Sequence, residues 1–186
     1  MKNSYATAEI PSPPSKYMRL SKGEKEQVFR ILGEQIQGTE GWKTQDDGTR
    51  KPVRVPIDES LNVDDIDDPD EIKYFWAMPV WNYQEKIIQI LEITQPSILK
   101  AIRAYARDED YGDPTGYDLK VTRAGESKET RYQTIAKPPK PLDKEILERY
   151  KDMKINLDAL YTGDDPFAES KGLTEKDIEE VAREVK

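Results

Sequence analysis

The sequence predicts a mainly β fold with helices, in which five short strands curl into a barrel and one helix caps an end of it. Two observations indicate this fold class. Segments with alternating apolar and polar residues recur between residues 17 and 136, separated by turns rich in Gly, Pro and Asp. One segment, 95–110, instead spaces its apolar residues as a helix does, and it lies between the third and fourth barrel strands.

The first part of the chain predicts a short strand, a bent strand and a hairpin. Residues 16–20 are typical of a short strand that the following turn ends. Residues 26–38 place apolar side chains on both faces, and Gly33 within them indicates a bulge or a bend. Residues 39–58 predict a hairpin with its turn at Asp-Asp-Gly. An acidic loop, 58–71, follows; a solvated loop and a weak cation site are both open interpretations.

Two strong strand candidates, 72–81 and 85–94, follow the acidic loop, because their Ile, Tyr, Phe and Trp content suits a half-buried pleated surface. The helix candidate then begins at Pro96, a residue that suits a first helical position. A second hairpin is predicted with strands near 117–124 and 130–136, where the prolines of 137–141 end it. Residues 143–160 predict an amphipathic helix, and 173–186 a short last helix.

The order strand, strand, strand, helix, strand, strand is that of the OB fold, a five-stranded barrel with a helix after its third strand. Closing the sheet removes strand edges that would otherwise be exposed. An open α+β sandwich remains the alternative. The predicted organisation is a disordered N-terminal arm (1–15), an OB domain (16–141) that carries the acidic loop, a helical extension (142–162) and an acidic C-terminal tail (163–186).

Charge is distributed unevenly along the chain. The 186 residues carry a net charge of -8, and the acidic loop alone holds eight acids and no base. Residues 164–186 hold eight acids and four bases, so the remainder of the chain is at +4. The local field, and not the net charge, decides which ligands approach a surface. The sequence therefore predicts a mildly basic body with two acidic appendages.

Aromatic and basic side chains gather in the two hairpins and the strong strands. Trp76 and Tyr74 share a strand face, and Trp42 and Trp81 lie in or near hairpin turns, where we expect partial exposure. Flat rings that stack bases beside cations that contact phosphates are typical of single-strand binding. Core packing of each aromatic and a solvated charged face remain the alternatives. The predicted DNA contacts are Trp42, Lys43, Arg50, Arg54, Tyr74, Trp76, Trp81, Lys120, Arg123, Arg131 and Tyr132.

The direction of three side chains in the second hairpin follows from strand alternation. If Leu119 and Val121 point into the core, Lys120 points outward. Arg123 has the inward parity but lies near the strand end, where its head can reach the rim. In the tail, Asp164, Asp165 and Phe167 predict a short motif that binds a protein partner, with packing of Phe167 on the body as the alternative.

The composition argues against an enzyme. The chain has no His and no Cys, which removes the usual zinc ligands and most nucleophile–base pairs. Phosphate-binding glycine loops and nucleophile elbows are also missing. We expect no catalytic residues, no metal and no cofactor. No apolar run approaches the length of a membrane span and the N-terminus is not a signal peptide, so we expect a cytoplasmic protein.

Residues 100–142 resemble the bacteriophage single-stranded DNA-binding proteins of OB type, above all in "YGDPTGYDLKVTRAG" and "TRYQTIA". The segments "MRLSKGE", "FRILG" and "GTRKPVRVP" extend the resemblance to residues 16–142. The resemblance implies coating of single-stranded DNA in phage replication or recombination, through Trp42, Trp76, Arg123, Arg131 and Tyr132. Several members carry a Cys-rich zinc-binding insertion in the first hairpin, which this chain lacks. Members also often end in an acidic tail that binds partners.

The main hypothesis is thus a sequence-tolerant single-stranded DNA-binding protein acting in DNA replication, recombination or repair, with RNA as an alternative ligand. Expected partners are replication or recombination proteins, through the acidic tail, and further copies of the chain along the DNA. The alternative is a protein-interaction module, a host-factor inhibitor or a transcription or replication accessory, that uses its acidic surfaces. Burial of Trp42, Trp76 and Tyr132 would favour that alternative.

Overall fold

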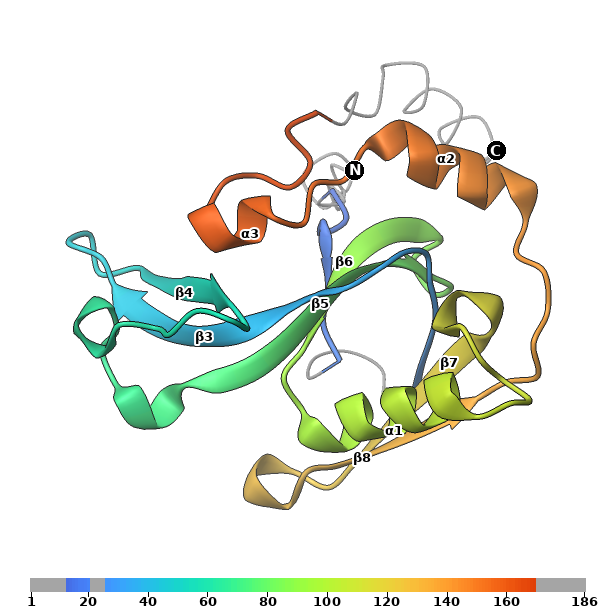
Figure 1. Ribbon diagram of the computed structural model, residues 1–186, viewed down its shortest axis with the longest axis horizontal. Helices are drawn as coiled ribbons and strands as arrows, with labels where there is room; N and C mark the ends of the chain where they lie inside the picture. The colour runs from blue at the N-terminus through green and yellow to red at the C-terminus, as the bar shows by residue number, and fades with distance from the viewer. Residues whose placement is uncertain (1–12, 21–25, 170–186) are drawn as a thin grey trace, which may run out of the picture.

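The computed structural model describes residues 13–20 and 26–169, and one mixed sheet organises them (Figure 1). Along the main path the strand order is β1-β6-β5-β2-β7-β8, and the β3–β4 hairpin joins the sheet through β3, which pairs with the first half of β5. The strands are β1 (Tyr17–Met18), β2 (Glu26–Ile31), β3 (Ile36–Thr44), β4 (Arg50–Pro56), β5 (Lys73–Asn82), β6 (Ile87–Ile93), β7 (Asp118–Ala124) and β8 (Arg131–Ala136).

Helices cover the sheet from both sides. In Figure 1, α1 (Pro96–Arg107) lies on one side, while α2 (Lys144–Met153) and α3 (Ala159–Thr162) lie on the other. Short 3-10 turns occupy the acidic loop (Val63–Asp65 and Pro69–Glu71) and the ends of β7 (Pro114–Gly116 and Ser127–Glu129). Within the described residues, no helix is both long enough and apolar enough to cross a membrane.

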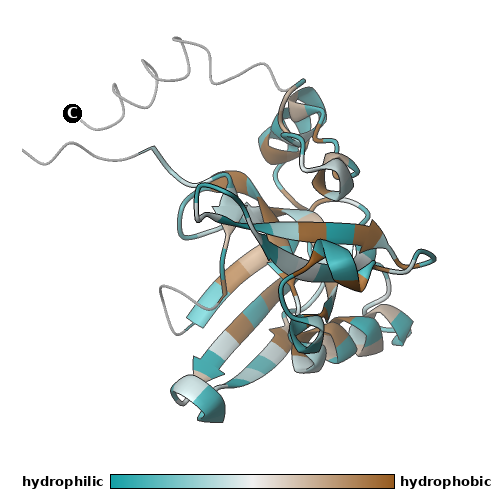
Figure 2. Ribbon diagram, turned by 90° about the vertical axis from the view of Figure 1, so that its left-hand side faces the viewer, coloured by the Kyte–Doolittle hydropathy of each residue, from teal (hydrophilic) through white to brown (hydrophobic). Residues whose placement is uncertain are grey.

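The main core lies between the sheet and α1. Strand alternation sends Phe29 and Ile31 of β2, and Leu119 and Val121 of β7, to this side, where all four are buried. Figure 2 shows the alternation of hydrophobic and hydrophilic residues along the strands. The helix begins with Pro96 as its first residue, and it buries its apolar stripe against the strands through Ile98, Leu99 and Ile102.

The opposite side of the sheet is covered by the chain after residue 141. Leu32, Trp81 and Ile88 form a second cluster under α2 and its flanks, and Phe75, Ala77 and Ile90 form a third with the segment around α3. The predicted single helix over 143–160 is interrupted, because Lys154 adopts a left-handed conformation (φ 46°) that ends α2. The expected exposure of Trp81 is wrong: the indole is 8% exposed, and Tyr83 meets it edge to face.

A buried ion pair joins β2 to β7 beside Trp81. Arg30, 1% exposed, donates from Nε to Oδ1 of Asp118 at 2.8 Å. Asp118 also accepts from the Tyr83 hydroxyl at 2.7 Å and pairs with Lys140 at 2.8 Å. Although burial opposes ionisation, the hydrogen bonds from Lys140, Tyr83 and Arg30 hold the pKa of Asp118 below its usual value. This network fixes the register between the two strands.

Replacing Asp118 with Ala should destabilise the protein by about 3–5 kcal/mol, because the change leaves the Arg30 charge buried without its partner. Urea denaturation followed by circular dichroism measures the loss. Glu26→Gln is the control: Glu26 pairs with Lys120 at 3.4 Å with more than half of its side chain exposed, so its loss should cost no more than about 1 kcal/mol. Equal effects of the two changes would contradict a structural role for the network.

The fold class agrees with the sequence at the coarser level. The protein is mainly β with helices, and both hairpins and the α1 helix lie where the pattern predicts them. The predicted bent strand 26–38 is instead divided into β2 and β3 by the non-strand residues 32–35 around Gly33. The sheet is open: no pairing between β6 and β8 is found in residues 26–169, and α1 packs against β8. Residues 1–12 of the predicted arm and the predicted helix 173–186 lie outside the described residues.

Candidate nucleic-acid interface

Strand register separates the two tryptophans that were expected to share one binding surface. Paired residues of an antiparallel sheet point to the same side, and Gln37 pairs with Trp76 while Gly38 pairs with Phe75. Trp42 has the parity of Gly38, so it lies on the side of Phe75. Trp76 and Tyr74 lie on the other side, which faces α1. A single DNA strand in one groove therefore cannot stack on both Trp42 and Trp76.

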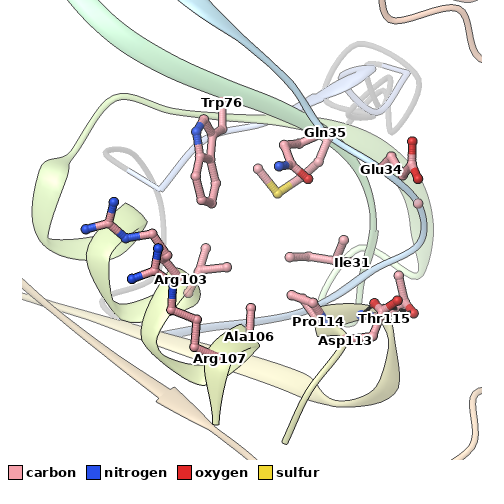
Figure 3. A pocket seen from close by; sticks show the side chains of 13 residues that line it. Ile31, Glu34, Gln35, Trp76, Arg103, Ala106, Arg107, Asp113, Pro114 and Thr115 are labelled. Atoms are coloured by element: carbon pink, nitrogen blue, oxygen red, sulfur yellow. Dashed lines mark hydrogen bonds between the residues drawn. The ribbon is translucent and has the colours of Figure 1, made fainter.

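A groove runs between β5 and α1 (Figure 3). It consists of two adjoining hollows of about 600 Å³ and about 490 Å³, which share Trp76 and Arg103 in their linings. The larger hollow extends over Tyr74 toward the start of α1, and the smaller one extends toward the end of α1 and the turn at Pro114. Trp76 and Arg103 thus stand between the two adjoining hollows, which together we call the "α1 groove".

Three cations line the helix side of the α1 groove. Lys100, Arg103 and Arg107 lie at positions i, i+3 and i+7 of α1, so they share one helix face. All three are exposed. None of them forms an ion pair with another residue of the described part of the chain. Their charge is therefore available to an anionic ligand.

Hydrogen bonds hold the aromatic side of the groove in place. The Trp76 indole N–H donates to the Tyr74 hydroxyl at 2.9 Å, and that hydroxyl donates to Oε1 of Gln37 at 2.7 Å. Trp76 also packs against the main core, while Tyr74 is 38% exposed. The chain of bonds restricts the indole before any ligand arrives, which lowers the entropic cost of binding a ring against it.

The acidic loop contacts the first hairpin through Ile66 and Asp67, while its eight acidic residues are exposed, as expected of a solvated loop. Ile66, 5% exposed, packs over Gly41, where an added Cβ would lie 2.6 Å from it. Asp67 accepts from the Thr44 hydroxyl at 2.6 Å and from the Thr44 backbone N–H at 2.8 Å, and these bonds hold the pKa of Asp67 below its usual value. No group of three or more acids able to hold a metal ion occurs within the described residues.

Two bases predicted to contact DNA in the first hairpin are engaged with the acidic loop. Arg50 forms a salt bridge with Glu71 at 2.7 Å, and its guanidinium lies over the Trp42 ring, 5.7 Å from the centroid. Lys43 donates to the backbone carbonyl of Asp64 at 3.3 Å. Trp42 is half-buried, in agreement with its expected partial exposure. These contacts form a local surface on the hairpin, and none of the three residues lines the α1 groove.

Arg54 is committed to two carboxylates on the side of the sheet away from the groove. It pairs with Glu40 at 3.2 Å and with Glu92 at 2.6 Å, with its side chain only 12% exposed. Its guanidinium also lies over the Phe75 ring. In the folded protein Arg54 is therefore already paired, and its contact with phosphate stays a prediction that these ion pairs do not favour. Burial, with the neighbouring Glu92 carboxylate, raises the pKa of Glu40 from 4.5 to about 7, although Arg54 opposes the shift.

The raised pKa of Glu40 predicts a pH dependence of stability. The carboxyl group of Glu40 binds its proton more tightly in the folded protein than in the unfolded chain. The contribution of Glu40 to the free energy of unfolding is therefore largest below about pH 4.5 and is lost as the pH rises toward about 7. Relative to Glu40→Gln, the wild type should lose about 2 kcal/mol between about pH 5 and about pH 8. Urea denaturation across this interval measures the difference; parallel pH profiles would contradict it. Glu71→Gln, at an exposed pair, should follow the wild type.

The second hairpin confirms the predicted directions of its side chains. Leu119 and Val121 are in the core, and Lys120 points outward, where it pairs with Glu26 at 3.4 Å. Arg123 pairs in register with Tyr132, so both point to the core side at the far end of the hairpin. Tyr132 is half-buried against the main core and Arg131 is exposed. Neither Arg123, Arg131 nor Tyr132 lines the α1 groove.

The predicted partner motif of the tail is packed on the body. Phe167 is 6% exposed and meets Tyr17 edge to face, with ring centroids 6.4 Å apart. Asp165 forms a salt bridge with Lys16 at 3.0 Å, and Asp164 accepts from the Thr162 hydroxyl at 2.6 Å. The alternative of packing on the body is therefore the one observed for Phe167, and insertion into a partner stays an untested prediction.

No family model, curated protein or solved structure matches the chain. The assignment of the candidate site therefore depends on the geometry of the structure alone. Sequence reasoning found Trp76 and Tyr74 but missed Lys100, Arg103 and Arg107 as candidate ligand contacts. The signal that could have found them is their i, i+3, i+7 spacing beside the buried stripe of the same helix.

Proposed function

We propose that the protein binds single-stranded DNA through the α1 groove with little dependence on sequence, and acts in DNA replication, recombination or repair. The observation that supports this most is Trp76, held by hydrogen bonds, opposite the unpaired cations Lys100, Arg103 and Arg107. A base can stack on the aromatic side while phosphates meet the helix side. This combination does not require a defined base sequence.

The strand arrangement supports an OB-type relation. The path β6-β5-β2-β7-β8 places the five predicted barrel strands in the order third, second, first, fourth, fifth, with α1 after the third. OB folds are partly open Greek-key barrels that bind oligonucleotides on one strand face and its flanking loops. In this proposal, the β3–β4 hairpin is an insertion between the first and second barrel strands, β2 and β5. Arg131 and Tyr132 of the second hairpin extend the DNA path beyond the groove.

The protein-interaction alternative has less support. Burial of all three predicted stacking residues would have favoured it, but Trp42, Trp76 and Tyr132 are each only half-buried. The acidic loop, which that alternative needs as its surface, is exposed, but it is partly engaged with Arg50 and Lys43 of the first hairpin. The α1 groove instead presents the cations of its helix side.

Titration with d(T) oligomers, followed by tryptophan fluorescence, tests the proposed function. We expect quenching with an affinity whose logarithm falls against the logarithm of salt concentration by about 0.7 for each phosphate neutralised. A duplex of equal length and an r(U) oligomer serve as comparisons. Absence of quenching together with absence of salt-sensitive binding would overturn the proposal, and stronger binding to r(U) would reassign the groove to RNA.

A further inference from the structure

The smaller hollow of the α1 groove has the form of a pocket for a single small ring. Its floor is apolar and comprises Ile31, Met78 and Ile102, all buried in the main core. Trp76 forms one wall, and Ala106 lies on the facing wall, on α1. Its volume of about 490 Å³ falls within the range of about 300–1,000 Å³ typical of small-ligand sites. We call it the "ring pocket".

The polar groups of the ring pocket are divided by charge between its two ends. Figure 3 shows the guanidinium groups of Arg103 and Arg107 at one end, and Glu34, Asp113 and Thr115 at the other. Oδ1 of Asp113 accepts from the hydroxyl and the backbone N–H of Thr115, both at 2.8 Å. Its Oδ2 has no hydrogen-bond donor within the described part of the chain. The acidic end thus presents acceptors, and the basic end presents donors.

We propose that the ring pocket receives one unstacked nucleobase of the bound strand and prefers a base with an exocyclic amino group, such as cytosine, to thymine. This inference rests on the proposed function and adds a base preference to it. The flat ring of the base packs on the apolar floor and against Trp76, and Arg103 and Arg107 bind the adjoining phosphates. The amino group then points to the acidic end, because carboxylates accept from the cytosine amino group. The same carboxylates give the O4 acceptor of thymine no donor.

Comparison of d(C) and d(T) oligomers of equal length tests the ring pocket, because both pyrimidine strands stack weakly. We expect the full chain to bind d(C) about three- to tenfold more tightly, a discrimination at the lower end of that for a good base contact. Glu34→Gln with Asp113→Asn should reduce the d(C) to d(T) ratio toward one. Both changes keep the size of the side chain, remove the charge and replace one carboxylate oxygen with an NH2 donor, which can bond the O4 acceptor of thymine.

A variant that fills the ring pocket tests whether the d(C) preference arises there. Ala106 is exposed at the pocket wall, so Ala106→Phe should block the pocket without disturbing the core. Ala104→Phe is the matched control, since Ala104 is exposed on the same helix and does not line either hollow. We expect Ala106→Phe to remove the d(C) preference and Ala104→Phe to keep it.

The outcomes separate this inference from the proposed function. Salt-sensitive binding of d(C) and d(T) with equal affinity would overturn the ring pocket and leave the proposed function in place. A d(C) preference that survives in Ala106→Phe would also overturn it, because the preference would then arise elsewhere. Binding of neither oligomer would overturn both.

Discussion

Replacing Trp76 with Ala should weaken d(T) binding about 5- to 150-fold, because each base stacked on an aromatic side chain contributes about 1–3 kcal/mol. Trp76 is the aromatic side chain that both hollows of the α1 groove share. Its indole N–H is bonded to Tyr74, so the ring is already positioned for a base. Fluorescence anisotropy of a labelled oligomer measures the change in affinity without depending on the tryptophan removed.

The matched control is Trp42→Ala, because Trp42 lies on the opposite side of the sheet. We expect this variant to bind d(T) within about twofold of the wild type. Trp76→Phe retains a ring and should recover much of the lost affinity. Circular dichroism checks that each variant is folded. Equal losses in Trp42→Ala and Trp76→Ala would contradict the assignment of the DNA strand to one face.

Neutralising the helix side of the groove should weaken binding and flatten its salt dependence. In the triple variant Lys100→Gln, Arg103→Gln and Arg107→Gln, the slope of log affinity against log salt should become less steep by about 2. Each of the three lost phosphate contacts accounts for about 0.7 of this change. The three side chains are exposed, so stability should change by no more than about 0.5 kcal/mol each. Titration at several salt concentrations measures the slope.

A charge-matched control is available on α2. Lys144, Arg149 and Lys151 are exposed on that helix, on the other side of the sheet, so their triple change to Gln removes the same net charge. We expect this control to lower affinity only slightly, through the long-range field, and to keep the wild-type slope. If the two triple variants shift the slope equally, the α1 groove does not hold the phosphates.

The sequence predicts well those features that depend on local periodicity. Alternation places Leu119 and Val121 inward and Lys120 outward, as the structure has them. The helical period of 96–107 and the turn around Gly48, which has a φ of 81°, are equally local. Such features follow from the spacing of side chains along one element, and a single sequence contains that information.

The candidate site depends on contacts that no local pattern encodes. Arg50 and Arg54 looked available in the sequence, but Glu71 and Glu92 reach them from other elements. The face on which Trp42 lies relative to Trp76 depends on the register between β3 and β5, and a shift of one residue would reverse it. Phe167 looked exposed because its anchor, Tyr17, lies at the other end of the described chain.

The distribution of charge has a structural consequence for the proposed function. The acidic loop and the carboxylates around Arg54 neutralise bases of the first hairpin. Cations on α1 have no such partners within the described residues. A chain with a net charge of -8 can therefore present a local basic trough. The trough, and not the first hairpin, is where we expect the DNA strand.

Photo-crosslinking to a d(T) oligomer that contains 5-iododeoxyuridine tests this claim most directly. Irradiation of the complex, followed by protease digestion and mass spectrometry, identifies the aromatic side chain that stacks on the base. We predict crosslinks at Trp76 and Tyr74, lost at high salt and absent in the α1 triple variant. Crosslinks confined to Trp42, or unchanged in the triple variant, would contradict binding in the α1 groove.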